Sequence, residues 1–225
     1  IDAYKRMLAA NSMLTPLTKD FEPGQGKIAA VLTIEGGEAI EERLENLRLF
    51  RELGVKAMTL TWNDQNELAS PAMARRDKGL SRLGRSVVRE MERINMAVDV
   101  AHLSDASIDG VLDEISAPIF SSHTNARRGG VVCVNYYSPQ LVERGRARIE
   151  DIVKHIEHIA AVGGIDCVAL GSDFDGMGQD AYPEGMNNWK DVPKLIAALQ
   201  KAGFGESDIR KIACDNLLNY MKRFV

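Results

Sequence analysis

Apolar residues are concentrated along the chain in six short runs, mostly bounded by glycine, proline or polar residues. The runs cover residues 28–34, 55–61, 96–101, 118–122, 131–136 and 167–171. Each run is nearly continuous in apolar residues, which is typical of strands covered on both faces in a parallel sheet. The pattern therefore predicts six buried β-strands.

Segments with helical periodicity lie between most of these runs. In residues 38–53 the apolar positions recur close to every 3.6 residues, and Gly54 follows as a C-terminal stop. Ser104 is a favourable N-cap for a helix over residues 105–115. Further helical patterns cover residues 1–8, 82–95, 147–162, 189–202 and 206–222. This alternation favours a (β/α) barrel or a doubly wound sheet.

One step breaks the alternation. A short polar and glycine-rich link joins the strand at 118–122 to the strand at 131–136, whereas a parallel crossover needs about a dozen residues or more. Either these strands form a hairpin, or a segment is absent between Arg128 and Gly129. Six strands also cannot close a barrel of eight. We therefore expect a single barrel domain over residues 1–225 that lacks N-terminal strands and this segment.

Composition narrows the classes of partner. The 225 residues are 45% hydrophobic and 27% charged, and the net charge of −4 does not favour nucleic acid or an anionic membrane. No apolar run approaches the ~20 residues of a membrane span, and the first residues lack the layout of a signal peptide. Cys133, Cys167 and Cys214 lie far apart and predict free thiols in a reducing compartment, so a cytoplasmic location is expected.

Four residues with metal-binding or acid–base chemistry directly follow predicted strands. They are Glu35, His102, His123 and Asp173. Ligands of α/β folds gather at the C-terminal ends of the strands, and three protein ligands plus water form the usual catalytic zinc arrangement. Such a metal lowers the pKa of bound water and polarises a scissile carbonyl. Asp173, which has no ligand role here, is a candidate for proton transfer.

Each of these residues also has a purely structural interpretation. A histidine at a strand end is more often structural, Glu35 would suit the N-terminus of the next helix, and Asp173 would suit a turn. His155 and His158 lie on one face of a predicted helix, which argues against a metal role. The metal hypothesis gains weight because the four residues share one end of the predicted sheet.

Long motifs in the chain match one known family in order and nearly throughout. The motifs are "TIEGGEAI" (33–40), "GLSRLGRSVVREMERINMAVDVAHLSD" (79–105), "APIFSSHTNAR" (117–127), "VNYY" (134–137), "LGSDFDG" (170–176) and "DNLLNYM" (215–221). In these segments the chain resembles the membrane dipeptidase (renal dipeptidase) family, including its bacterial members.

The resemblance implies a zinc-dependent dipeptidase built on a (β/α)₈ TIM barrel. It implies two Zn²⁺ ions bridged by Glu35, with His102 and His123 at one of the two sites. It implies that Asp173 assists proton transfer while a metal-bound hydroxide attacks the peptide bond of a dipeptide. The expected ligand is therefore a small dipeptide, and a homodimer is left open.

Three departures from the family pattern keep alternatives open. The family's His-x-Asp ligand pair is absent from the chain, and so is a segment after "SHTNAR" that carries a substrate-binding arginine. A family histidine after the third barrel strand is replaced by Trp62, followed by Asn63. Together with Tyr137, which follows another strand, these two are candidates for the substrate pocket.

Two other functions compete with a dipeptidase. One is a related metal amidohydrolase acting on N-acyl amino acids or other small amides. The other is a catalytically degenerate homologue with an incomplete second zinc site. A nucleotide-binding fold ranks last, because the glycines after the first strand lack G-x-G-x-x-G spacing.

Overall fold

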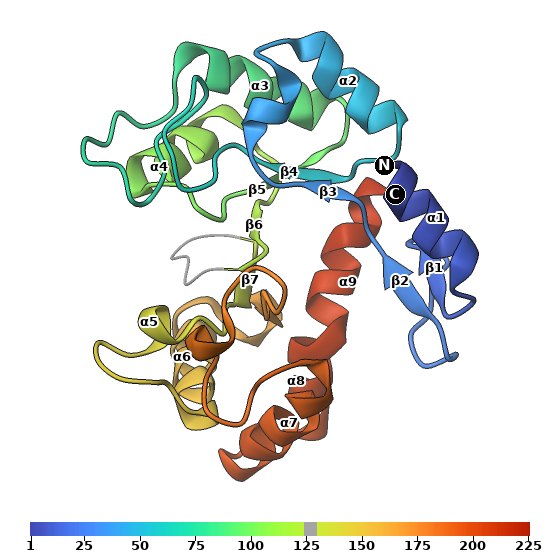
Figure 1. The fold of residues 1–225 in the computed structure, drawn as a ribbon, viewed down its shortest axis with the longest axis vertical. Coiled ribbons are helices and arrows are strands. Elements are labelled where there is room, and N and C mark those ends of the chain that lie inside the picture. Colours follow the sequence, from blue (N-terminus) through green and yellow to red (C-terminus); the bar gives the residue numbers. More distant parts are fainter. Residues whose placement is uncertain (124–129) are drawn as a thin grey trace. The chain divides into compact units, whose positions relative to one another are not determined.

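The computed structural model describes residues 1–123 and 130–225 (Figure 1). The predicted break between Arg128 and Gly129 lies outside the described residues. The chain divides into two compact units, Ile1–Ile119 with Met221–Val225, and Phe120–Tyr220. The single barrel domain expected from the sequence stays a prediction, and each unit is described by itself.

The first unit is built on three parallel strands in the order β3–β4–β5. The strands are β3 (Thr33–Ile34), β4 (Ala57–Thr59) and β5 (Ala97–Asp99), and the helices are α2 (Leu44–Glu52), α3 (Arg82–Arg93) and α4 (Asp105–Glu114). The strands and helices alternate along the chain, so each parallel connection contains a helix. This part of the α/β prediction is confirmed.

The two faces of β4 and β5 differ in what they contact. Met58 and Leu60 point into a core cluster with Val98 and Val100, against apolar residues from α2, α3 and α4. Since side chains alternate across a strand, Thr59 lies on the opposite face of β4. That face carries polar side chains toward the C-terminal ends of the strands, where the candidate site lies.

Two sequence predictions in the first unit are corrected by the structure. Residues 28–34 form two strands rather than one, because β2 (Ile28–Ala30) pairs with β1 (Leu14–Pro16) in a separate parallel sheet. The helix predicted over 38–53 begins only at Leu44. Before it lies a 3-10 turn over Gly37–Ile40, followed by Glu41 and Glu42 with positive φ values of 51° and 58°.

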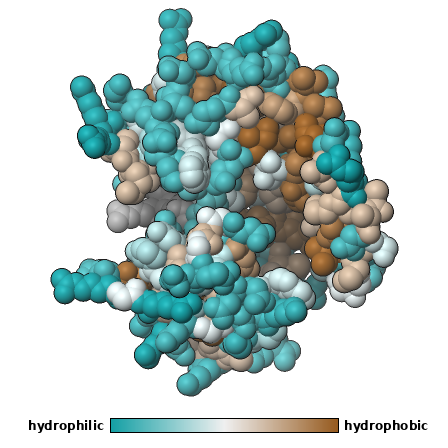
Figure 2. All heavy atoms as spheres, in the orientation of Figure 1, coloured by the Kyte–Doolittle hydropathy of each residue, from teal (hydrophilic) through white to brown (hydrophobic). Residues whose placement is uncertain are grey.

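The N-terminal segment of the first unit carries exposed apolar side chains. Helix α1 (Asp2–Ala10) has no buried residue, and Met7, Met13 and Ile28 are 47%, 53% and 54% exposed. Figure 2 shows apolar surface over the region of α1, β1 and β2. This segment therefore adds little to the core that supports the site.

The second unit contains three further parallel strands in the order β6–β7–β8. The strands are β6 (Phe120–Ser121), β7 (Val131–Val134) and β8 (Val168–Leu170), and the helices are α5 (Ser138–Leu141), α6 (Ile149–Gly163), α7 (Val192–Lys201) and α8 (Glu206–Arg210). Val132 and Val134 pack into a core with apolar residues of α6 and α7. The six strands of β3–β8 fall short of the eight in a complete barrel.

The register of β6 and β7 excludes one explanation of their short connection. Phe120 pairs with Val131 and Ser121 with Val132, both in parallel. The hairpin alternative is therefore wrong, and the connection is shorter than a parallel crossover normally requires. The C-terminal helical prediction over 206–222 holds in outline, although a π-helical turn at Lys211–Asp215 separates α8 from α9 (Asn216–Met221).

None of the described helices is both long enough and apolar enough to cross a membrane.

Candidate functional site

Glu35 and His102 lie together at the C-terminal ends of β3 and β5 in the first unit. His102 Nε2 is 3.1 Å from Glu35 Oε1, and their side chains are 22% and 50% exposed. An imidazole nitrogen and a carboxylate oxygen this close, both reached by solvent, are two ligands that one divalent cation can hold. The structure thus brings together two of the three predicted ligands.

Two glycines set the position of Glu35. The N–H of Gly36, which has φ 93°, donates to Thr59 Oγ1 at 2.7 Å, and the N–H of Gly37 donates to Leu60 O at 3.2 Å. A Cβ atom on Gly37 would lie 2.6 Å from Leu60 O. The "EGG" sequence therefore allows the loop after β3 to lie directly against the end of β4.

His102 stands on left-handed backbone with φ 65°. Its carbonyl accepts a hydrogen bond from the N–H of Ala72 at 2.7 Å, and three residues earlier Asp99 Oδ1 accepts from the N–H of Ala101 at 3.0 Å. Non-glycine residues rarely adopt this conformation, and such strain clusters at functional sites. Contacts on both sides of His102 hold the turn that directs its imidazole toward Glu35.

A buried polar network continues from His102 into helix α4. Ser104, the predicted N-cap, accepts from the N–H of Ser107 at 3.2 Å, and its hydroxyl lies 2.7 Å from Asp77 Oδ1. Ser107 Oγ in turn donates to Ser70 O at 2.9 Å. Burial by itself raises the pKa of the Asp77 carboxyl, but hydrogen bonds from Ser104 and from the N–H of Gly79 outweigh it and lower that pKa.

Trp62 and Asn63 follow β4, which lies between the strands that precede the two candidate ligands. The Trp62 side chain is 53% exposed, and its ring centroid lies 6.4 Å from that of His102. Asn63 is also exposed. An indole exposed beside a candidate ligand can cover one side of a bound small molecule.

His123 follows β6 in the second unit and is half-buried. The Ser122 hydroxyl lies 2.7 Å from His123 Nδ1. A hydrogen bond at Nδ1 fixes the ring and leaves Nε2 as the nitrogen suited to a metal.

Asp173 follows β8 and also has left-handed backbone, with φ 54°. The next residue, Phe174, packs edge-on against the rings of Tyr136 and Tyr182, with centroids 5.6 Å away in both cases. Burial raises the pKa of Tyr182, and the carboxylates of Asp175 and Asp173 raise it further. The aromatic contacts of Phe174 anchor the "SDFDG" turn that presents Asp173.

Tyr137, the last predicted pocket residue, follows β7 and is half-buried. Its N–H donates to Asn135 Oδ1 at 2.7 Å. His123, Tyr137 and Asp173 thus follow three adjacent parallel strands, so they lie at the same edge of the β6–β7–β8 sheet.

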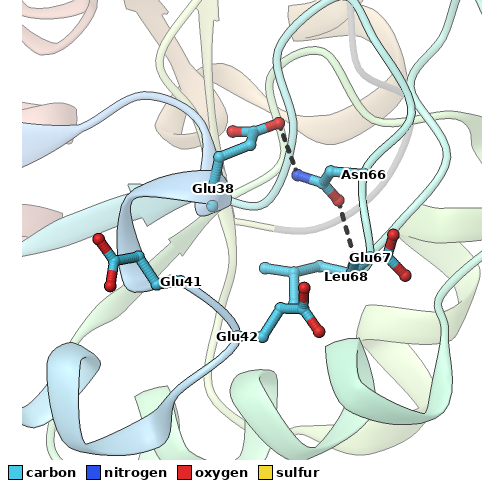
Figure 3. A pocket seen from close by; sticks show the side chains of 7 residues that line it. Glu38, Glu41, Glu42, Asn66, Glu67 and Leu68 are labelled. Carbon is cyan, nitrogen blue, oxygen red and sulfur yellow. Dashed lines mark hydrogen bonds between the residues drawn. The ribbon is translucent and has the colours of Figure 1, made fainter.

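A small acidic pocket of about 140 Å³ lies beyond Glu35 in the first unit. Figure 3 shows Glu38 joined to Asn66, whose Nδ2 donates to Glu38 Oε1 at 2.8 Å, and the pocket also contains Glu41, Glu42 and Glu67. Asn66 also caps the backbone of Leu68, with Oδ1 2.9 Å from its N–H. The pocket therefore belongs to the loops that support the end of β4.

The sequence interpretation overlooked Thr61. Its side chain is fully buried, and within residues 1–123 and 130–225 its hydroxyl has no hydrogen-bond partner. The sequence did contain a signal for this residue, because Thr59 and Thr61 are, with Lys56, the polar members of an otherwise apolar run over residues 55–61. Their shared face and the alternation with Leu60 place both hydroxyls opposite the apolar core.

The sequence profile of the membrane dipeptidase family (peptidase family M19) matches residues 1–129 and 126–224 of the chain. Dipeptidase 3 of Rattus norvegicus is 30% identical over 249 residues, covering 99% of this chain and 51% of that protein. An uncharacterised dipeptidase of Schizosaccharomyces pombe is 33% identical over 254 residues, covering 99% and 61%. The chain thus spans between half and about three fifths of these relatives' lengths.

Solved structures share the fold. An amidohydrolase from Pseudomonas aeruginosa matches with a TM-score of 0.88 at 23% identity, covering 99% of this chain and 82% of that one. A metallo peptidase from Rhodobacter sphaeroides, bound to a phosphinate mimic of the dipeptide L-Ala-D-Ala, matches with a TM-score of 0.86 at 24% identity, covering 100% and 72%. These likenesses show the fold, and the profile match over nearly the whole chain shows that the chain belongs to the membrane dipeptidase family.

Proposed function

We propose that this chain forms the catalytic part of a zinc-dependent dipeptidase, in which Glu35, His102 and His123 hold a divalent cation. The observation that carries the proposal is the 3.1 Å approach of His102 Nε2 to Glu35 Oε1 in a chain of this family. His123 is included because it also follows a parallel strand at its C-terminal end and has Nδ1 hydrogen-bonded.

The donor set fits zinc. Two imidazoles and one carboxylate are the ligand types of catalytic zinc sites, which keep one position open. A zinc ion held there would lower the pKa of a water molecule toward neutrality and polarise the carbonyl of a bound amide. A second zinc, which Glu35 would hold together with the first, is part of the proposal because the family resemblance implies it.

The remaining site residues act on the substrate, one in proton transfer and three in binding. Asp173 would take up the proton that the attacking water releases and pass it to the leaving amine nitrogen, a role suited to a carboxylate presented on a rigid turn. Trp62, Asn63 and Tyr137 form the walls that hold a small dipeptide. The cytoplasmic location, the homodimer and the single catalytic domain stay predictions.

The proposal includes a family segment that is absent between Arg128 and Gly129. Three findings support it. The family profile matches in two pieces that meet at residues 126–129, and alignments of 249 and 254 residues exceed the 225 of this chain. The parallel pairing of β6 with β7 also calls for a longer connection.

Metal analysis of the purified chain tests the ligand set. We expect the parent to contain bound zinc and His102→Ala and His123→Ala to have lost most of their zinc content. His158→Ala is the matched control, because His158 is exposed on α6 and should leave zinc content unchanged. Zinc content that is unaffected by the first two changes would refute the ligand set.

A substrate panel tests the reaction. Dipeptides and N-acyl amino acids of matched side chains separate a dipeptidase from a related amidohydrolase. We expect Asp173→Asn to keep its zinc and lose most turnover. A parent that binds no metal and turns over neither class would favour the degenerate homologue.

A further inference from the structure

The buried hydroxyl of Thr61 lies two residues past the end of β4, the strand between the two strands that Glu35 and His102 follow. Strand β4 pairs with β3 on one side and β5 on the other, with Thr33 opposite Ala57 and Ala57 opposite Ala97. Continuing this register places Thr61 beside the residue that precedes His102. It therefore lies within the first unit, at the same strand ends as both ligands.

The direction of the side chain follows from its neighbours on β4. Leu60, the first residue past β4, packs into the apolar core, and the alternation of the strand carried on to the next residue points Thr61 to the opposite face, where Thr59 lies. Thr59 Oγ1 reaches the N–H of Gly36 at 2.7 Å, which shows that this face of β4 looks toward the Glu35 loop. The Thr61 hydroxyl continues the same row, one step closer to the end of the strand.

A buried hydroxyl without a partner is costly, and most buried polar groups are paired. Thr61 is 0% exposed, and in the described part of the chain its Oγ1 has no hydrogen-bond partner. Valine has the same shape without the hydroxyl, so packing alone does not require threonine here. The hydroxyl is therefore poised for a group that binds at the strand ends.

We propose that Thr61 is a positioning residue of the cation site, whose hydroxyl donates a hydrogen bond to an oxygen donor of the cation, either the Glu35 carboxylate or a water molecule. Ligating carboxylates are usually held by such outer hydrogen bonds, and losing one typically weakens metal affinity about 10- to 100-fold. The inference rests on the proposed metal site and extends it to a residue with no ligand atom of its own.

The test compares Thr61→Val, Thr61→Ser and Thr59→Val by Zn²⁺ titration calorimetry, Co²⁺ absorption spectra and melting of the metal-free chain. Thr61→Val should bind Zn²⁺ about 10- to 100-fold more weakly, with an altered Co²⁺ spectrum. Its metal-free melting temperature should equal or exceed that of the parent, because a buried unpaired hydroxyl is removed. Thr61→Ser should restore the metal affinity.

Thr59→Val is the matched control for stability. It is the same threonine-to-valine change two residues earlier in the chain, but it removes the acceptor of the Gly36 N–H, so the metal-free melting temperature of Thr59→Val should fall. A similar fall for Thr61→Val would show that the hydroxyl is structural and would overturn the inference.

Two further outcomes separate this inference from the proposed function. If the parent binds Zn²⁺ and Thr61→Val binds it equally well, the inference fails and the metal site stands. If Zn²⁺ affinity is unchanged but the KM for a dipeptide substrate rises, the hydroxyl acts on the substrate and the inference is again wrong. A parent that binds neither Zn²⁺ nor Co²⁺ overturns both.

Discussion

Replacing Ser107 with alanine tests whether the polar network after His102 holds that loop in place. Ser107 is fully buried, its hydroxyl donates to Ser70 O at 2.9 Å, and its oxygen accepts from the Ser70 N–H at 3.1 Å. A serine hydroxyl carries one hydrogen. Because the Asp77 carboxylate lies 2.7 Å from Ser104 Oγ and attracts the Ser104 hydrogen, the contact between Ser104 and Ser107 adds no third bond.

The loss of stability in Ser107→Ala depends on whether the former partners of the Ser107 hydroxyl keep other hydrogen bonds. Two hydrogen bonds are lost, yet both groups of Ser70 keep another partner. Its N–H still donates to Gly79 O at 3.2 Å, and its carbonyl still accepts from the Ser104 N–H at 3.0 Å. With no buried group orphaned, each bond is worth ~1 kcal/mol, so the free energy of unfolding should fall by about 2 kcal/mol.

Urea unfolding followed by circular dichroism measures this loss in the metal-free chain. The matched control is Ser86→Ala on α3, whose exposed hydroxyl donates to Arg82 O at 3.3 Å and should change the free energy of unfolding by less than about 0.5 kcal/mol. Zinc affinity should fall in Ser107→Ala but not in Ser86→Ala, because Ser107 belongs to the hydrogen-bond network next to His102 and Ser86 does not. Equal stability losses in the two variants would refute the reasoning, as would unchanged zinc affinity in Ser107→Ala.

Three further predictions concern the turn after β8, an ion-pair cluster and the metal itself. In Gly176→Ala the new Cβ would overlap Asp173 Oδ1, so turnover should fall about 10- to 100-fold with zinc content unchanged; normal turnover would mean that the Asp173 position is not critical. Hydrogen bonds from Arg93 and then Arg48 lower the pKa of Glu90 from 4.5 to about 2. The ionised form is therefore favoured in the folded state, and its contribution is complete above pH 4.5 and lost as pH falls toward 2. Urea unfolding at a series of pH values measures this contribution. Between neutral and acidic pH the free energy of unfolding should fall by about 1–3 kcal/mol less in Glu90→Gln than in the parent, a range that allows for the exposure of both arginines. Chelation of bound zinc should lower the melting temperature of the parent, and zinc should restore it; a melting curve indifferent to zinc would contradict binding to the folded state.

Much of the fold was readable from periodicity, because the apolar runs and helical patterns are distinct. Periodicity did not reveal which strands pair with one another. Nothing within residues 28–34 marks the point where β2 ends and β3 begins, since an apolar run satisfies two adjacent sheets as well as one. Ile40 likewise keeps the helical period across the break at Glu41 and Glu42, so periodicity alone concealed the left-handed turn.

The candidate site was predicted from strand ends, and the geometry supports this most directly for Glu35 and His102. Position at a strand end identifies which residues can meet, because parallel strands share an edge. It does not identify supporting groups such as Ser107, whose partners come from a distant loop. Thr61 was overlooked for another reason, since threonines within an apolar run are also compatible with ordinary strand packing.

The left-handed backbone at His102 and Asp173 has a consequence for laboratory evolution. At φ values of 65° and 54°, any side chain other than glycine costs about 1 kcal/mol, and asparagine is among the least disfavoured. Selection for heat resistance alone should thus favour glycine or asparagine at these two positions, and it would remove the side chains of the proposed site without unfolding the chain. Libraries built on this scaffold need a catalytic screen in every round.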